Sequence, residues 1–168
     1  GGPVSQRLGQ VARRLLRAPA RLYDWHAGWL LGPRFVRLTH VGRRTGRRHR
    51  TILETIGTDR EVDELLVLVG MGPTADWYRN IQKHPALELA TMRRRFRPVH
   101  QVLAEREAVL ALAEYERRNR WALFVIRPVL SWLAGWHYDG GDQARLRLAQ
   151  QLPIVAFRPD PASPRRPI

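Results

Sequence analysis

A short arginine-rich segment, Gly42–Thr51, carries the clearest chemical signal in the sequence. It holds five arginines and two glycines between two stretches with the residue pattern of β-strands. Guanidinium groups bind phosphate and carboxylate oxygens two at a time, and glycine lets backbone N–H groups come close to an anion. We interpret the segment as a hairpin turn that binds a polyanion. A solvated, arginine-rich surface turn is the alternative.

Positive charge is concentrated in the N-terminal part of the chain. The formal net charge is +14, and residues 1–50 contain twelve arginines and a single acid, Asp24. This imbalance predicts an anionic partner, for which phosphate, an acidic lipid surface and nucleic acid are the candidates. Nucleic acid is disfavoured because the basic residues gather at a turn and a helix instead of alternating with aromatics along a strand. Lys83 is the only lysine among 29 basic residues, an actinobacteria-like composition typical of GC-rich genomes, so net charge alone is a weak sign.

Other reactive side chains are few. The chain has no cysteine, which excludes disulfides, thiolate metal sites and a cysteine nucleophile. Its six histidines do not show the spacing of metal ligands, so no metal site is expected. Any redox chemistry would therefore need a cofactor.

Short β-type stretches separated by turn residues follow Arg34. Six strands predict a barrel or a strongly curved sheet. The stretch Leu65–Val69 is uninterrupted apolar sequence, as expected for a strand covered on both faces. Asp76 is expected to cap the first of three helices, and Pro159–Ile168 is expected to be a proline-rich tail. The predicted strands are Phe35–Val41, Thr51–Ile56, Leu65–Val69, Leu87–Met92, Phe96–Leu103 and Ile154–Phe157, and the helices are Trp77–Lys83, Glu105–Arg118 and Gln143–Gln151.

The segment before the first strand has the pattern of a basic amphipathic helix. Apolar residues of Ser5–Ala18 fall on one side of a helical wheel and arginines on the other, and Pro19 ends the pattern. Trp25 and Trp29 follow, and such aromatics beside a basic helix are typical of an interfacial membrane anchor. Packing of the same apolar stripe on its own domain is the alternative.

A second apolar segment, Trp121–Trp136, contains one charged residue, Arg127. It is too short to span a membrane, and Pro128 interrupts it. A buried helix pair is the simplest prediction. A lid over an apolar substrate, a subunit interface and a second bilayer contact are the alternatives.

Several ordered motifs follow the hairpin and together identify a family. In this order and spacing the chain resembles the deazaflavin (F420)-dependent nitroreductase and quinone reductase family of flavin and deazaflavin oxidoreductases. The resemblance covers about Phe35–Pro159 and implies an α+β fold. It implies a split β-barrel of about six strands, an N-terminal amphipathic helix and C-terminal helices packed on the barrel. The motifs are Val69-Gly70-Met71-Gly72, Asp76-Trp77-Tyr78-Arg79-Asn80-Ile81, Arg95-Phe96-Arg97-Pro98 and Leu152-Pro153-Ile154-Val155-Ala156-Phe157-Arg158-Pro159.

The expected organisation has three parts. Residues 1–33 form the basic amphipathic segment, residues 34–159 the deazaflavin-binding barrel, and residues 160–168 a flexible tail. The resemblance implies coenzyme F420 as the cofactor and makes FMN a weaker candidate. Its ring needs an apolar slot, while its phosphodiester and glutamate tail need cations. By position in the motifs, the cofactor-binding residues are Arg43, Arg44, Thr45, Gly46, Arg47, Arg50, Thr51, Ile52, Met71, Gly72, Trp77, Tyr78 and Asn80, with Arg48 also near the tail. Core packing is the alternative role for Trp77 and Tyr78.

The activity implied by the resemblance is hydride transfer from reduced F420 to a hydrophobic conjugated acceptor, such as a quinone or a nitroaromatic. Strand Leu65–Val69 lacks the hydroxyl residue that some family members carry at its end, which leaves Tyr115 and Tyr138 as candidate proton donors. The resemblance is consistent with a cytoplasmic enzyme, peripheral on the inner membrane face through residues 3–31, and with a homodimer. The alternative is a non-catalytic module that holds a deazaflavin, flavin, haem or lipid.

Overall fold

The structure, a computed structural model, describes residues 35–59, 61, 63–163 and 166–167 of the chain. The predicted N-terminal helix and the tryptophans Trp25 and Trp29 lie outside the described residues.

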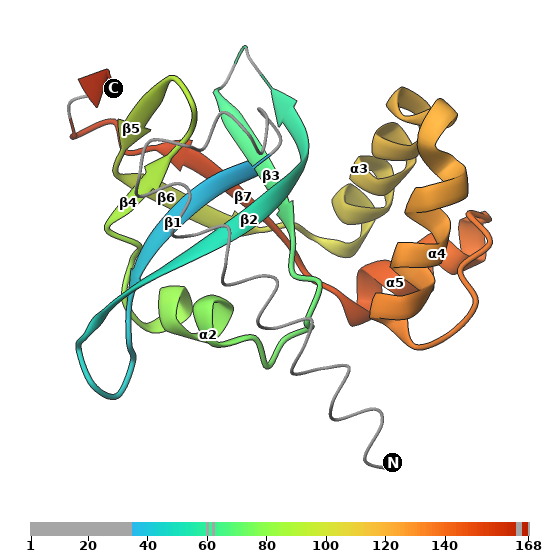
Figure 1. Cartoon of the computed structure of the whole chain (residues 1–168), viewed down its shortest axis with the longest axis horizontal. Coiled ribbons are helices and arrows are strands. Elements are labelled where there is room, and N and C mark those ends of the chain that lie inside the picture. The colour runs from blue at the N-terminus through green and yellow to red at the C-terminus, as the bar shows by residue number, and fades with distance from the viewer. Residues whose placement is uncertain (1–34, 60, 62, 164–165, 168) are drawn as a thin grey trace.

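A curved antiparallel sheet forms the larger part of the molecule (Figure 1). Its strand order is β6-β7-β3-β2-β1-β4-β5-β8. The strands span Phe35–Val41 (β1), Arg48–Asp59 (β2), Glu64–Leu68 (β3), Glu88–Ala90 (β4), Arg94–Phe96 (β5), Pro98–Val102 (β6), Ile154–Pro159 (β7) and Arg166–Pro167 (β8).

The connection between β5 and β6 closes this sheet into a barrel. These two strands lie near opposite ends of the strand order, yet only Arg97 separates them in sequence. Because one residue bridges only a few ångströms, the two sides of the sheet must curl toward each other. The predicted α+β split barrel is therefore confirmed.

Strand β3 is covered on both faces, as its apolar sequence predicts. Leu65 and Val67 point into the barrel core with Leu38, while Leu66 and Leu68 pack against a second core. This second core includes Leu112, and it joins the outer face of the barrel to the helices that follow β6. Alternate residues of a strand point to opposite faces, so five residues can serve both cores.

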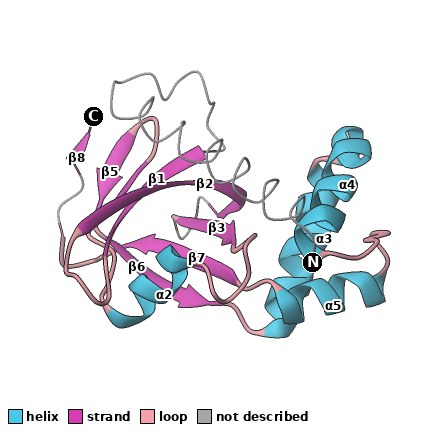
Figure 2. Cartoon of the chain, turned by 60° about the horizontal axis from the view of Figure 1, so that its bottom comes forward, coloured by secondary structure: helices cyan, strands magenta, loops and turns pink. Residues whose placement is uncertain are grey.

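Five helical segments complete the described chain. Helix α2 (Asp76–Lys83) lies at the end of the barrel from which the β1–β2 hairpin projects (Figures 1 and 2). Helices α3 (Glu105–Arg118), α4 (Leu123–Ala134) and α5 (Asp142–Gln151) stand together at one side of the barrel, and we call them the helical lobe. A 3-10 turn, η2 (Arg120–Ala122), connects α3 to α4.

The structure corrects three expectations about these elements. The predicted strand Phe96–Leu103 is divided, because Pro98, which has no N–H to donate, begins a new strand. Asp76 lies in the first turn of α2, and Ala75 occupies the N-cap position. Residues 166–167 of the predicted tail pair with β5 as a strand.

The segment Trp121–Trp136 also differs from the prediction. It forms η2 and a single helix α4 that continues through Pro128, in place of a buried helix pair. Its large aromatic side chains Trp121, Phe124 and Trp132 are exposed. None of the helices in the described residues is long and apolar enough to cross a membrane.

Candidate functional site

The β1–β2 hairpin has a tight turn that glycine makes possible. Gly46 adopts a left-handed backbone with φ of 69°, a region that other residues rarely enter. The Gly42 N–H donates to the Arg47 carbonyl at 2.8 Å, and the Gly46 N–H donates to the Gly42 carbonyl at 2.9 Å. These two amides close the turn, so neither is directed at an anion as the glycine pattern had suggested. The glycine amides are thus used within the turn, which leaves its side chains as the exposed cationic groups.

Arg43 fastens the hairpin to α2. Its backbone N–H and its Nη1 both donate to Oδ1 of Asn80, at 3.1 Å and 2.9 Å, and Nη1 also reaches Oδ1 of Asp76 at 3.2 Å. Asp76 and Asn80 are four residues apart and therefore share one face of the helix. This contact explains the spacing of the Asp76-Trp77-Tyr78-Arg79-Asn80 motif, and it occupies Arg43 inside the protein.

His40 stabilises the same contact by holding Asn80. Asn80 Nδ2 donates to Nδ1 of His40 at 3.0 Å, which requires the neutral imidazole. His40 is buried and stacks on His49 with ring centroids 5.6 Å apart. Burial, together with the nearby His49, lowers the pKa of His40 from 6.5 to about 4, and Asp76 opposes this shift only in part.

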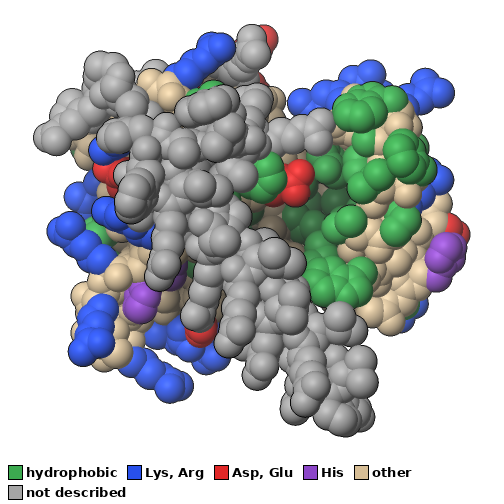
Figure 3. Space-filling model, viewed as in Figure 1, with side chains coloured by type: hydrophobic (Ala, Val, Ile, Leu, Met, Phe, Trp, Pro, Cys, Tyr) green, Lys and Arg blue, Asp and Glu red, His purple; other side chains and the backbone are tan. Residues whose placement is uncertain are grey.

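The outer side of the hairpin presents the remaining arginines to solvent. Arg44, Thr45, Gly46, Arg47, Arg48 and Arg50 are all exposed, Thr51 is half-buried, and Ile52 is buried in the sheet. Figure 3 shows Lys and Arg side chains at this end of the molecule. Among the predicted phosphate and tail residues, Arg44, Thr45, Gly46 and Arg47 thus lie exposed on the turn, and Arg50 lies exposed on the adjoining end of β2.

The predicted ring residues divide into two groups. Tyr78 is buried in the barrel core, and Trp77 packs against that core with its ring 6.5 Å from Phe157. Met71 is exposed beside Gly72, whose φ is 78°. Gly70 has no side chain to displace Leu133, which packs closely on it, so this loop also contacts helix α4. The core role is therefore found for Tyr78, and Met71 remains accessible.

Tyr115 lies at a cavity of about 870 Å³ at the other end of β2 from the hairpin. The cavity is bordered by the ends of β2 and β3, the β4–β5 turn and the C-terminal end of α3. Asp63 and Arg94 form an ion pair in its wall. The structure does not bring Tyr115 together with the arginine turn.

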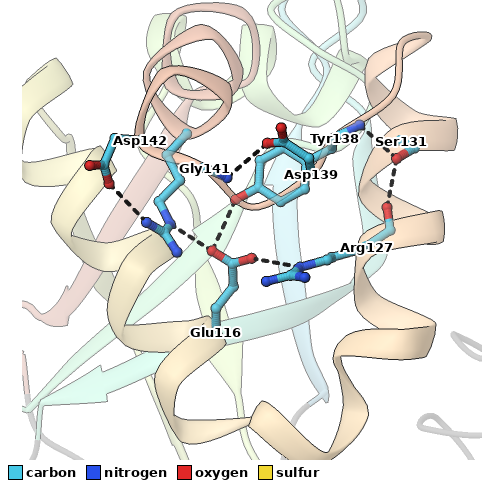
Figure 4. A network of polar contacts seen from close by, with 8 residues as sticks. Glu116, Arg127, Ser131, Tyr138, Asp139, Gly141 and Asp142 are labelled. Atoms are coloured by element: carbon cyan, nitrogen blue, oxygen red, sulfur yellow. Dashed lines mark hydrogen bonds and ion pairs between the residues drawn. The ribbon is translucent and has the colours of Figure 1, made fainter.

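Tyr138 is fully buried in a polar network within the helical lobe (Figure 4). Its hydroxyl donates to Oε2 of Glu116 at 3.0 Å, and Arg145 Nε donates to the same oxygen at 2.7 Å. Arg127 Nε lies 3.7 Å from the other oxygen of Glu116. Burial and the Glu116 carboxylate raise the pKa of Tyr138 above its usual value. A phenol that no solvent or ligand reaches is poorly placed to donate a proton to a substrate.

Two residues that position the hairpin were not predicted from the sequence. His40 and Gly42 were not among the predicted site residues, although a Cβ at Gly42 would lie 2.6 Å from Oγ1 of Thr45. Gly42 belongs to the glycine-arginine motif, so that pattern could have indicated it. His40 gave no comparable signal because a single histidine in a strand has many ordinary roles. No cluster of potential metal ligands occurs in the described residues.

Comparison with known sequences identifies one family. A sequence model of the F420H(2)-dependent quinone reductase family matches residues 17–123. The matched range includes the arginine hairpin, the Met71 loop and α2, and it ends at the start of α4. No curated protein matches the chain.

Solved structures with a related arrangement are distant in sequence. An F420-H2 dependent reductase, FDR-A, is 12% identical, with 74% of this chain and 94% of that chain covered and a TM-score of 0.42. A pyridoxamine 5′-phosphate oxidase-related, FMN-binding protein of Nostoc punctiforme PCC 73102 is 14% identical, with 95% of both chains covered and a TM-score of 0.48. Protein Atu2129 of Agrobacterium tumefaciens strain C58 is 11% identical, with 80% of this chain covered and a TM-score of 0.48. The present chain spans 51% of the length of that protein.

Proposed function

Because the chain belongs to the F420H(2)-dependent quinone reductase family, we propose that it transfers a hydride from reduced coenzyme F420 to a hydrophobic conjugated acceptor such as a quinone or a nitroaromatic. Family membership makes it an F420-dependent oxidoreductase. The acceptor class and the residues that bind each ligand are our proposals.

The proposed binding mode is based on the exposed arginines of the β1–β2 hairpin, which Arg43 joins to α2. A cofactor with a phosphodiester and several carboxylates needs exposed cations on a rigid support. Arg44 and Arg47 of the turn and Arg48 and Arg50 at the start of β2 are exposed on a hairpin that Arg43 joins to α2. The chemistry of these donors fits an acidic cofactor, because guanidinium groups pair with phosphate and carboxylate oxygens.

We assign different tasks to the arginines of this turn. Arg44 and Arg50, with the Thr45 and Thr51 hydroxyls, would hold the phosphate, and Arg47 and Arg48 would attract the glutamate tail. Arg43 and Asn80 would hold the turn in place without contacting the ligand, because they donate to and accept from each other. Met71 and Gly72 would border the ring, with Trp77 behind them.

When bound, the reduced deazaflavin supplies the hydride, so the protein has to orient the two ligands and exclude water. The apolar acceptor would lie beside the exposed Met71, on the loop that contacts helix α4 through Gly70 and Leu133. Of the two candidate proton donors, Tyr138 is buried, and Tyr115 borders a cavity that lies at the other end of β2 from the hairpin. A membrane contact through residues 3–31 remains a prediction from the sequence.

A binding titration tests the proposed tasks. A charge-assisted contact between arginine and phosphate is worth about 1.5–3 kcal/mol, so Arg44→Ala or Arg50→Ala should weaken F420 binding by roughly ten- to a hundredfold. Arg47→Ala and Arg48→Ala should each cost about 1 kcal/mol or less, because ion pairs to a solvated tail are weak. Fluorescence titration with F420 at two salt concentrations measures all four losses.

FMN, which lacks the glutamate tail, is the matched control ligand. Wild-type protein that binds FMN as tightly as F420 would contradict the cofactor assignment. Equal small losses at all four arginines would show a diffuse positive surface. Tight F420 binding without turnover of any quinone or nitroaromatic would favour the non-catalytic binding module.

A further inference from the structure

The helical lobe exposes a continuous apolar stripe along η2 and α4. Trp121, Phe124 and Trp132 are 72%, 78% and 57% exposed, and Val125 and Val129 lie between them, about half exposed. We call these five residues the aromatic stripe. Their spacing of three, four and seven residues places them on one side of the helix. The opposite side carries Ile126, Leu130 and Ala134, which are buried in the core.

Such a stripe is unusual for a surface that faces only water. Single exposed apolar residues are common, whereas contiguous exposed patches of large side chains mark contact sites for proteins or membranes. Figure 3 shows hydrophobic side chains gathered over the helical lobe. The buried face of α4 packs against the core of the helical lobe. The aromatic stripe is on the other face and is available for a partner.

The charge around the aromatic stripe is positive. Residues 117–136 contain four arginines, at 117, 118, 120 and 127, and no acid. Arg120 is exposed directly beside Trp121. Arg117 and Arg118 are exposed at the same end and share the carboxylate of Glu114. Figure 3 shows basic side chains at this end of the lobe, next to the hydrophobic ones.

From this juxtaposition we infer that the aromatic stripe docks on an anionic membrane surface. Tryptophan and phenylalanine insert at the level of lipid headgroups, and neighbouring arginines pair with acidic lipids. Helix α4 has twelve residues and is about 18 Å long, far less than the roughly 30 Å of a hydrocarbon core, so it lies along the surface.

The charge also decides against two other partners for the aromatic stripe. Residues 1–34 of the chain carry six arginines and one acid, so this segment would bring like charge to the lobe. A second copy of the chain would bring the same excess of arginine, because Arg120 adds to Arg117 and Arg118, which share the single carboxylate of Glu114. Like charges brought together across an apolar contact oppose association, whereas an anionic bilayer neutralises them.

Flotation of the full-length protein with vesicles tests this inference. Trp121→Ser/Trp132→Ser should lower partitioning onto vesicles of phosphatidylcholine containing phosphatidylglycerol by about tenfold or more. Arg120→Glu should lower it on these vesicles and have little effect on pure phosphatidylcholine. Added salt should weaken the binding of the wild type. Residues 1–34 are present in every variant, so their own contribution cancels in the comparison.

Leu110→Ser is the matched control, because Leu110 is 64% exposed on α3 outside the aromatic stripe. It should partition as the wild type does. Equal partitioning of the wild type and the double variant, or an equal loss in Leu110→Ser, would overturn the inference. Dissociation of a dimer by the double variant in sedimentation velocity, without any change in vesicle binding, would show a contact between copies instead. If the double variant melts early, the single change Phe124→Ser at the most exposed position gives the decisive comparison.

Discussion

At the scale of single residues, the arginine hairpin shows that identical side chains take different tasks. Arg43 and Arg44 are neighbours of the same type, yet Arg43 is held by Asp76 and Asn80 while Arg44 faces solvent. The bonds of Arg43 depend in turn on His40, which must stay neutral to accept from Asn80. The geometry of the turn is therefore linked to a group that titrates.

We expect acid to destabilise the hairpin through His40. Its pKa is about 4 in the folded protein and near 6.5 in an unfolded chain, so the unfolded state binds the proton first as the pH falls. The free energy of unfolding should thus decrease between pH 6.5 and 4, by up to about 3 kcal/mol. Urea denaturation at several pH values measures this loss. F420 affinity should fall through His40 only near pH 4, where the folded protein takes up this proton.

His40→Gln is the control for this effect, because glutamine offers an acceptor that does not titrate. Subtracting the free energies of unfolding of the two proteins at each pH removes the contribution of the carboxylates, which both proteins share. Stability curves that run parallel from pH 6.5 to 4 would show that His40 is not the group responsible.

At the scale of elements, the buried carboxylate of Glu116 connects the three helices of the helical lobe. Glu116 of α3 receives the Tyr138 hydroxyl and Arg145 of α5, and Arg127 of α4 lies beside its other oxygen (Figure 4). A buried carboxylate is stable only when such donors surround it. Three helices are thereby fixed around Glu116, which gives Tyr138 a structural task.

Replacing each tyrosine by phenylalanine separates the two candidate proton donors. Tyr138→Phe should lower the free energy of unfolding by about 1.5–3 kcal/mol, because it removes a hydrogen bond to a charged group. Its turnover number per folded molecule should stay close to that of the wild type. Tyr115→Phe should lower the turnover number per folded molecule if Tyr115 donates the proton, and an unchanged turnover number would exclude it. Loss of turnover in Tyr138→Phe at unchanged stability would return Tyr138 to the role of proton donor.

At the scale of the whole molecule, the barrel and the helical lobe share a core. Ile56 of β2 and Ile154 of β7 lie in one buried cluster with Leu112 of α3 and Leu148 of α5. Neither the outer face of the barrel nor the helices could leave this surface exposed to water without losing the free energy of its burial. We therefore propose that residues 34–159 fold as one domain.

Leu112→Ala tests this proposal, because Leu112 is fully buried at the junction. The change should lower the free energy of unfolding by about 2–5 kcal/mol. Far-ultraviolet circular dichroism and tryptophan fluorescence should still report one coincident transition. Two separate transitions, only one of them shifted by the change, would show that barrel and lobe unfold independently.

The sequence alone was sufficient to predict most elements and the family. Strand Phe35–Val41 and helix Glu105–Arg118 occur at the predicted residues, because alternation and helical periodicity are local properties of a chain. Family membership followed from the order of several short motifs, and the match over residues 17–123 confirms it. The cofactor-binding residues indicated by those motifs stay a prediction.

Only the tertiary structure could assign individual side chains to the inside or the outside. Periodicity shows that Trp121–Trp136 has an apolar side, but a wheel does not show which side meets the core, and the structure turns Trp121 and Trp132 outward. Likewise, five arginines in one turn look alike until Asp76 and Asn80, more than thirty residues away, single out Arg43. Burial and ion pairing depend on contacts between distant segments, and these contacts exist only once the barrel has closed.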